Sequence, residues 1–438
     1  PSSSKGIHDG NFDRCFTEGH KIMTKDGYKD ISKIVLDDIV LSHDGSYNKV
    51  YELFKSNFNG ELVSLKPLGN DKVINSTPNH PFLIGRYSKK PHGRNWMKRK
   101  DNLDIIDWVE AKDIKKGDFL FIPNKKERVE RVLNDDILYL LGWYLSDGNI
   151  SSSNCLRICF QGDQMEMAIK CKEILEKYDE FLPAQFEITH HMTGKKFKSH
   201  KDKKKPSIKK IPNKFAYNLE CTSHWFNSIV KEYVTLLKGG EKILNQNLVN
   251  QKNLIPLILG FFEGDGHQTF DKLGRSSLQL SGTYLTMIYQ FREIILNEGI
   301  WCTISPIKSK DENHNNQLRI DIQDWIGINR VVEKSLKFKT IPLNRKQRSN
   351  VLKKDNGFWI PVKKIESVDY QGFVYNCEVE NTHSYTVDFI ATHNCIAFYH
   401  ALILANHLDK YLPMDKFISN KDKKEEPRLQ TPASPFSS

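Results

Sequence analysis

The sequence lacks the features that mark membrane and secreted proteins. No run of apolar residues approaches membrane-spanning length, and the N-terminus has no charged segment followed by an apolar one, as a signal peptide would. The eight cysteines include no Cys-x-x-Cys pair, so the usual ligand spacing of a structural zinc site is missing. These absences favour a reducing compartment, cytoplasmic or nuclear, with no membrane partner and with thiols available for chemistry.

Charge is in excess on the positive side. The 438 residues carry a formal net charge of +11 at pH 7, and 39% of them are hydrophobic. A chain of this length and composition can form two or three domains, each with its own core. The positive balance favours a polyanionic partner, of which nucleic acid is the commonest, although many basic proteins have none.

Turn signals at short spacing predict an all-β region from Cys15 to about Pro123. Short strands are predicted at 21–24, 31–35, 39–41 and 119–122, separated by turns such as Asp-Gly and Lys-Gly-Asp. Similar β-type runs return from about 358 to the junction at 394. Between these stretches, long helical patterns alternate with short strands.

A nine-residue segment in the helical stretch occurs twice. Residues 140–148 read LLGWYLSDG, and residues 258–266 read ILGFFEGDG. Each copy is followed by a predicted strand, a helix, two more strands and a second helix, which gives repeats at about 132–236 and 250–340. The duplication predicts a pair of units related by a pseudo-two-fold axis, in a monomer.

The repeated segments carry a glycine and an acid at matching positions. Gly142 and Gly260 would let two helices approach closely, and Asp147 and Asp265 at the helix ends would then meet. Paired carboxylates together with phosphate oxygens form an oxygen-ligand site for Mg²⁺ in phosphodiester hydrolysis. One copy alone would more often be a packed helix with a capping glycine, but two copies favour the metal site.

The segment with the clearest chemistry lies at Ala391 to Cys395. The side-chain nitrogen of Asn394 can attack its own backbone carbonyl, close a five-membered imide and break the chain. His393 can protonate the departing amine or polarise that carbonyl, and Cys395 supplies a thiol that can receive an acyl group. His-Asn-Cys alone would be a chance tripeptide, so its context decides.

That context resembles the conserved blocks of inteins, the self-splicing protein insertions. Residues 374–380 (VYNCEVE), followed by HSYTV at 383–387 and by the junction, are similar to the intein C-terminal signature. Residues 76–83 (STPNHPFL) contain the Thr-x-x-His pattern of the second intein block, and Cys15 opens the β-rich region. The repeated segments resemble the LAGLIDADG motif of the homing endonucleases that many inteins carry.

The resemblance implies a multidomain fold, in which an all-β Hint-type splicing domain is interrupted by an α+β, pseudo-two-fold LAGLIDADG endonuclease domain. The splicing domain would comprise residues 15–123 and 346–394, with the endonuclease at 132–345. Residues 1–14 and 395–438 would be the flanks, or exteins, the second of them ending in a disordered tail.

The resemblance also implies a splicing sequence that needs no cofactor. Cys15 would form a thioester with the residue before it, Cys395 would take over the acyl group, and cyclisation of Asn394 would release the insertion. The host exteins are then partners in cis. The residues that receive a splicing role in this way are Cys15, Thr77, His80, His383, His393, Asn394 and Cys395.

For the endonuclease, the family implies Mg²⁺ at Asp147 and Asp265 and a long site on double-stranded DNA. Lysines in a basic loop between two strands of the first repeat would hold phosphates, and Lys308 would be a helper near the metal. A solvated charged loop is the alternative for these lysines. The candidate DNA-binding residues are Lys195, Lys196, Lys198, Lys203, Lys204, Lys205 and Lys308.

One position departs from the family pattern. Inteins often carry an aspartate where this chain has Asn376, and Cys377 follows it, either as a substitute for the acid or as strand core. Three alternatives remain: an ordinary DNA-binding or nuclease protein, a hedgehog-type autoprocessing module that cleaves without ligation, and an intein with an inactive endonuclease. The first leaves Cys15 and His80 without a role, and the second has no use for Asn394.

Overall fold

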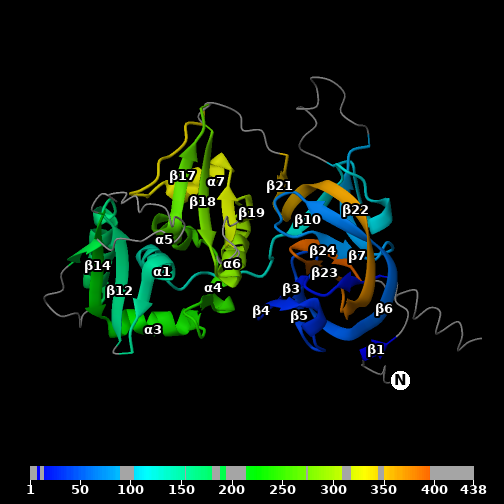
Figure 1. Cartoon of the computed structure of the whole chain (residues 1–438), viewed down its shortest axis with the longest axis horizontal. Coiled ribbons are helices and arrows are strands. Elements are labelled where there is room, and N and C mark those ends of the chain that lie inside the picture. Colours follow the sequence, from blue (N-terminus) through cyan, green and yellow to red (C-terminus); the bar gives the residue numbers. More distant parts are fainter. Residues whose placement is uncertain are drawn as a thin grey trace, which may run out of the picture. The chain divides into compact units, whose positions relative to one another are not determined.

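A computed structural model gives the fold of the compact unit formed by residues 1–394 (Figure 1). The described residues are 7–9, 14–88, 103–152, 154–179, 188–193, 214–272, 275–307, 317–343 and 350–394. Within these ranges, no helix is long and apolar enough to cross a membrane. The fold is largely sheet, with helices concentrated in the middle of the chain.

The largest sheet has 14 strands among the described residues, taken from the two ends of this unit. The strands are β1 (Ile7–Asp9), β2 (Phe16–Thr17), β3 (Lys21–Thr24), β4 (Gly27–Asp30), β5 (Ile39–Leu41), β6 (Tyr47–Pro67), β7 (Ile74–Ser76), β8 (Pro81–Arg86), β9 (Ile105–Glu110), β10 (Phe119–Pro123), β21 (Leu352–Lys354), β22 (Gly357–Val379), β23 (Ser384–Val387) and β24 (Ile390–His393). Strands far apart in sequence therefore share one set of hydrogen bonds.

Two long antiparallel strands, β6 and β22, form the backbone of this sheet and lie side by side in Figure 1. Their pairing runs from Pro67 opposite Val362 to Val50 opposite Val379, with two register shifts. Over much of β6 the side chains alternate between buried and partly exposed, as expected for a strand with one face on a core. This ribbon joins the first part of the unit to its last part.

The predicted strand at 31–35 is wrong. Residues Ile31–Lys33 form a 3-10 turn, because the Asp30 carboxylate accepts a hydrogen bond from the Ser32 N–H and caps it. A local side-chain bond of this kind competes with strand pairing. A second 3-10 turn, Ala111–Asp113, follows β9.

The middle of the chain contains two four-stranded sheets with the same strand order, β11-β12-β14-β13 and β17-β18-β20-β19. The first group of elements is α1 (Asp135–Asp147), β11 (Gly148–Ile150), β12 (Cys155–Gln161), α2 (Met165–Tyr178), β13 (Ile188–Thr193), β14 (Lys214–Thr222) and α3 (His224–Tyr233). The second is α5 (Ile255–Asp265), β17 (Gly266–Phe270), β18 (Ser276–Gly282), α6 (Leu285–Asn297), β19 (Cys302–Ile307), β20 (Gln317–Ile322) and α7 (Trp325–Val332). Between them lie β15 (Val234–Leu236), β16 (Lys242–Leu244) and α4 (Gln246–Val249).

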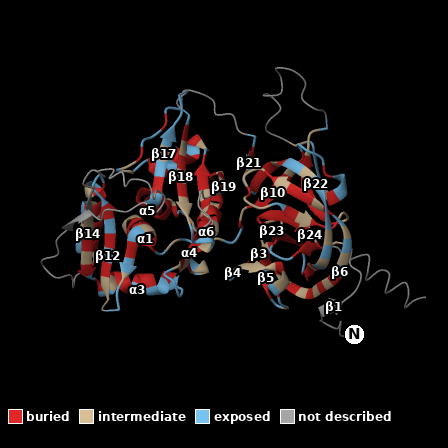
Figure 2. Cartoon of the chain, viewed as in Figure 1, coloured by how far each residue is buried: buried red, intermediate tan, exposed pale blue. Residues whose placement is uncertain are grey.

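Helices α1 and α5 are buried along their middle turns, residues 138–145 and 257–264 (Figure 2), and they touch each other through backbone atoms. A Cβ atom on Gly260 would lie 2.2 Å from the Tyr139 carbonyl oxygen, and one on Gly142 would lie 2.5 Å from the Leu257 carbonyl oxygen. Glycine is therefore required at both positions, because any larger residue would push the helices apart.

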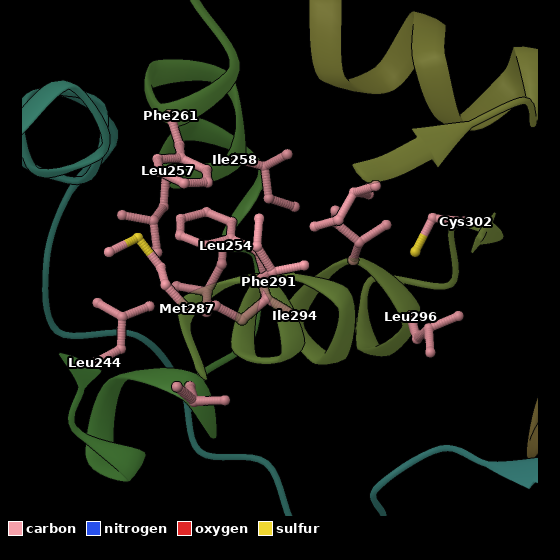
Figure 3. Packing of buried hydrophobic residues seen from close by; sticks show 14 of the residues in the cluster. Leu244, Leu254, Leu257, Ile258, Phe261, Met287, Phe291, Ile294, Leu296 and Cys302 are labelled. Carbon is pink, nitrogen blue, oxygen red and sulfur yellow. The ribbon is translucent and has the colours of Figure 1, made fainter. Parts of the chain in front are cut away.

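The core behind α5 is built of aliphatic and aromatic side chains (Figure 3). Phe261 of α5 stacks on Phe291 of α6, with ring centroids 3.8 Å apart, and Leu257 and Ile294 are fully buried in the same core. This packing holds α5 against α6.

We expect Gly260→Ala to lower the stability of the protein. The new methyl group would meet backbone atoms, which cannot rotate away, and overpacking of this kind costs about 1–3 kcal/mol. The upper part of that range exceeds the gain of about 1 kcal/mol that alanine brings to a helix. The midpoint of thermal unfolding, followed by circular dichroism, measures the effect.

Gly60→Ala is the matched control, because a Cβ atom there would meet only the Phe58 ring, at 3.4 Å. Equal unfolding midpoints for the two variants would contradict the close approach of α1 and α5.

Candidate functional site

Cys15 directly precedes strand β2, which lies between two neighbouring strands. Phe16 pairs with Tyr375 of β22 and with Ser76 of β7. The Cys15 N–H donates to the Thr77 hydroxyl at 2.8 Å, and the Thr77 N–H donates to the Cys15 carbonyl at 2.9 Å. Cys15 is fully buried. The peptide bond between Arg14 and Cys15 is therefore fixed by Thr77 on its nitrogen side.

His80 is fully buried next to this peptide. Its ring centroid lies 4.1 Å from that of Phe16, and its Nε2 contacts the hydroxyl of Thr392 in β24. Burial lowers the pKa of His80 to about 3, although the Arg14 backbone carbonyl favours the protonated ring. The imidazole is thus neutral at physiological pH.

The C-terminal junction is equally enclosed. Asn394 is buried, and its N–H donates to the His383 carbonyl at 2.9 Å. With the side-chain amide oriented to satisfy both of its ends, Oδ1 accepts from the Val379 N–H at 2.6 Å and Nδ2 donates to the His383 carbonyl. The side chain that would attack is therefore held by two backbone groups.

His393 lies against the bond that Asn394 would break. Its Nδ1 contacts the Asn394 carbonyl oxygen, and its ring packs edge-on against Trp108 with centroids 4.9 Å apart. Burial lowers the pKa of His393, while the contact with the Asn394 carbonyl opposes that change. The geometry lets His393 polarise this carbonyl.

His383 lies at the same junction, but its backbone rather than its ring faces Asn394. The imidazole is half exposed, with Nδ1 3.5 Å from Glu378 Oε1. His383 also has a positive φ of 49°, in the left-handed region that non-glycine residues rarely adopt. The conformation of this turn directs the His383 carbonyl to Asn394.

Thr392 was not predicted from the sequence. Strand β24 pairs with β8 through Thr392 and Phe82, which brings the Thr392 hydroxyl to His80 and to the Pro81 carbonyl at 3.0 Å. His80 thereby contacts residues of both junctions. Only the pairing of distant strands creates this link, so no local motif could have revealed it.

Cys377 has the properties of strand core. It is fully buried in β22, and burial raises the pKa of its thiol far above the usual range. A thiol held in its protonated form is a poor nucleophile. Of the two sequence interpretations, a substitute acid and a core residue, these properties match the second.

Several predicted site residues lie outside the described part of the chain, and the structure says nothing about them. They are Cys395 at the C-terminal junction and the basic residues Lys195, Lys196, Lys198, Lys203, Lys204, Lys205 and Lys308.

Asp147 and Asp265 are the last residues of α1 and α5 and line one cavity of about 680 Å³. Burial and the neighbouring Asp147 raise the pKa of Asp265 to about 6, and burial raises the pKa of Asp147 as well. No group of three or more His, Cys, Asp or Glu side chains with metal-site geometry occurs in the described ranges. A cation here would therefore have two protein carboxylates, with its other ligands drawn from backbone, water or substrate oxygens.

Two lysines, the buried Lys242 and the partly buried Lys337, hold the helix ends that carry these acids. Lys242 Nζ donates to the carbonyls of Tyr144 and Gly148, each at 2.6 Å, and Lys337 Nζ donates to the Glu263 carbonyl at 2.7 Å. Burial lowers the pKa of Lys242 to about 8 and also lowers that of Lys337. Sequence reasoning missed both lysines, because they follow the repeated segments at unequal distances and in no common motif.

A family model described as the intein splicing domain matches residues 16–394. An iron–sulfur cluster assembly SufBD family protein of Mycobacterium tuberculosis is 25% identical over 405 residues, which covers 87% of this chain and 43% of that protein. The ATP-dependent DNA helicase Hel308 of Thermococcus kodakarensis is 22% identical over 423 residues, 87% of this chain and 36% of that protein. The chain thus spans less than half the length of these two curated relatives.

Two solved structures show a fainter likeness. The AceL NrdHF class 3 split intein has 22% identity and a TM-score of 0.20, and the match covers 26% of this chain and 67% of that one. The homing endonuclease I-WcaI bound to its DNA recognition sequence has 16% identity and a TM-score of 0.31, covering 47% of this chain and 83% of that one. TM-scores this low support no conclusion about function.

The family match rests on the sequence of nearly the whole compact unit and includes the residues around both junctions, except Cys15 and Cys395 themselves. It confirms the resemblance that the conserved blocks predicted. The chain belongs to the intein splicing domain family.

Proposed function

We propose that this intein excises itself and ligates its flanks, and that its splicing domain, residues 15–123 and 346–394, is interrupted by a homing endonuclease at 132–345. The observation that most directly supports splicing is the position of His80. Its backbone N–H bonds to Thr77 beside Cys15, and its ring contacts Thr392, two residues before Asn394. One residue therefore contacts neighbours of both junctions.

In the first step the Cys15 sulfur attacks the Arg14 carbonyl carbon. A carbon–sulfur bond forms, the bond to the Cys15 nitrogen breaks, and that nitrogen takes up a proton. The Thr77 hydroxyl accepts from the Cys15 N–H and keeps this nitrogen aligned. The proton lost from the thiol is balanced by the proton that the Cys15 nitrogen gains. The neutral His80 imidazole, which bonds to the Arg14 carbonyl, polarises the peptide rather than acting as the base.

In the later steps the Cys395 sulfur attacks the thioester and releases the Cys15 thiol. Nδ2 of Asn394 then attacks its own carbonyl, which His393 polarises, and the bond to Cys395 breaks with a proton transferred to the departing amine. That amine attacks the thioester at Cys395, forms the new peptide bond and restores the thiol. The role of Cys395 rests on the family resemblance, and its thiol requires a reducing cytoplasm or nucleus.

The acid pair supports a second activity, site-specific cleavage of double-stranded DNA by a monomer with internal pseudo-two-fold symmetry. Asp147 and Asp265 fit a divalent cation, because a cation between them would relieve the repulsion that raises the pKa of Asp265. Mg²⁺ would supply an activated water and stabilise the leaving oxygen. Lys242 and Lys337 fix the helix ends that present the acids. The lysines between 195 and 205 would hold phosphates.

We expect intact-mass spectrometry of the chain fused to larger flanking tags to show a ligated-flank product and a free 15–394 product ending in a succinimide. Cys15→Ala blocks the thioester, and Asn394→Ala blocks cyclisation, so neither variant should yield the ligated product. A ligated product from either variant would contradict the assignment, and so would an unprocessed wild-type chain under reducing conditions.

His393→Ala is expected to slow cyclisation of Asn394 roughly 10²-fold, because the carbonyl loses the group that polarises it. Cleavage before residue 395, measured by mass spectrometry in a Cys15→Ala background, reports this step alone. Thiol-induced cleavage at Cys15, measured in an Asn394→Ala background, should stay unchanged. Equal slowing of both cleavages would show that His393 acts only through the fold.

We expect Asp265→Asn to raise the thermal unfolding midpoint at pH 7.5 in the absence of divalent cations. The folded-state pKa of Asp265, about 6, lies above the ordinary value of 3.8. The wild type therefore gains the full stabilisation from a protonated Asp265 below about pH 4 and loses it as the pH rises through 6. The asparagine removes this penalty, because it carries no charge at any of these pH values. At pH 4 the two proteins should unfold alike.

Mg²⁺ should then raise the unfolding midpoint of the wild type but not that of Asp265→Asn, and the variant should no longer cut DNA. Glu173→Gln, at an exposed acid on α2, is the control. A Mg²⁺ response in Asp265→Asn equal to that of the wild type would exclude the metal site.

A further inference from the structure

We propose that Asn376 is a catalytic residue of the first splicing step, in which its side-chain amide stabilises the negative charge that develops on the Arg14 carbonyl oxygen. The inference rests on the splicing chemistry proposed above and adds to it a group at the position where the family pattern has an acid. Its basis is a direct contact with the reacting carbonyl.

Asn376 Nδ2 donates to the Arg14 carbonyl oxygen at 2.5 Å. The contact follows from the sheet register, because Phe16 pairs with Tyr375 and the residues before and after them, Cys15 and Asn376, are brought opposite each other. Asn376 is only 6% exposed, so little water competes for its amide group. A short contact in an enclosed site is the arrangement expected of an oxyanion donor.

The orientation of the amide is set by its other end. Asn376 Oδ1 accepts hydrogen bonds from the Tyr385 hydroxyl at 2.6 Å and from the Cys377 N–H at 2.8 Å. Both partners are donors, so the oxygen must face them and the NH₂ group must face Arg14. Tyr385 and the Cys377 backbone are thus positioning groups, and Tyr385 is itself fully buried.

This donor matches the electron flow of the acyl shift. When the Cys15 sulfur bonds to the Arg14 carbonyl carbon, the carbonyl electron pair moves onto its oxygen, where Nδ2 already points. Collapse of this intermediate breaks the bond to the Cys15 nitrogen, which takes a proton, and the thioester carbonyl re-forms. Because the donor is in place beforehand, no reorganisation is needed as charge develops.

An asparagine can do this where an ionised aspartate cannot. A carboxylate only accepts hydrogen bonds and would repel the developing oxyanion, whereas an amide NH₂ donates and carries no charge. A protonated aspartate would donate again. The exchange of Asp for Asn at 376 therefore converts a titrating position into a permanent donor.

The test isolates the first step in an Asn394→Ala, Cys395→Ala background of the full chain with flanking tags. Dithiothreitol then cleaves the thioester at Cys15, and intact mass gives the rate. We expect Asn376→Ala to lower this rate roughly 10²- to 10³-fold, the usual loss for one oxyanion donor. Tyr385→Phe should lower the rate less, because it removes only one of the two hydrogen bonds that orient the Asn376 amide. Asn59→Ala, at an exposed asparagine of β6, should leave the rate unchanged.

The pH dependence of the cleavage rate of Asn376→Asp distinguishes a chemical role of residue 376 from a purely structural one. The ratio of its rate to that of the background chain should rise as pH falls from 8 to 5, because the aspartate becomes a donor when protonated. The other titratable groups around this position are Cys15, Cys377, Tyr385 and His80. They are common to both proteins, so their effects cancel in the ratio.

The outcomes separate this inference from the proposed splicing activity. If the background chain shows no thiol-induced cleavage, the splicing assignment fails and the role of Asn376 fails with it. If it cleaves and Asn376→Ala cleaves equally fast, only the role of Asn376 is overturned. A second assay measures Asn394 cyclisation in a Cys15→Ala background with native Asn394 and Cys395. If Asn376→Ala slows this cyclisation as much as it slows the thioester step, the variant has a general folding defect and the role of Asn376 is overturned.

Discussion

The placement of strand β2 between β22 and β7 is the constraint on which the splicing site depends. The strand has only two residues, yet Phe16 pairs with Tyr375 on one side and with Ser76 on the other. That register sets the residue before it, Cys15, between Thr77 and Asn376. The long β6–β22 ribbon makes the arrangement stable, because a shift of one residue would turn every side chain to the opposite face.

Each of the two carbonyls at the junctions is contacted by a nitrogen-bearing side chain. Asn376 contacts the Arg14 carbonyl, and His393 contacts the Asn394 carbonyl. The Asn376 amide has a fixed charge state, whereas the His393 imidazole can gain or lose a proton. His80, which touches the neighbourhood of both junctions, is held neutral by burial. In the proposed chemistry, permanent polarisation and proton transfer would thus be the work of different side chains.

The sequence predicted the parts of this arrangement that local patterns encode. Turn residues marked the strands at 21–24, 39–41 and 119–122, and the repeated segments marked α1 and α5 with their glycines and terminal acids. Ile31–Lys33 was misassigned because the capping bond of Asp30 outweighs strand propensity. Thr392, Lys242 and Lys337 escaped detection because their partners are backbone or side-chain atoms far away in sequence. Such contacts exist only once strands and helices have been assembled.

The contact between Gly142 and Gly260 also has an evolutionary side. Backbone atoms set the spacing of α1 and α5, so almost no side chain other than hydrogen is tolerated at these two sites. The outer strands are freer, since every second residue of β12 is at least partly exposed. For the proposed endonuclease, the strands could therefore vary and meet new targets while the acid pair stays in place. A substitution at either glycine would shift the helices and with them the acid pair, whatever residues the outer strands carry.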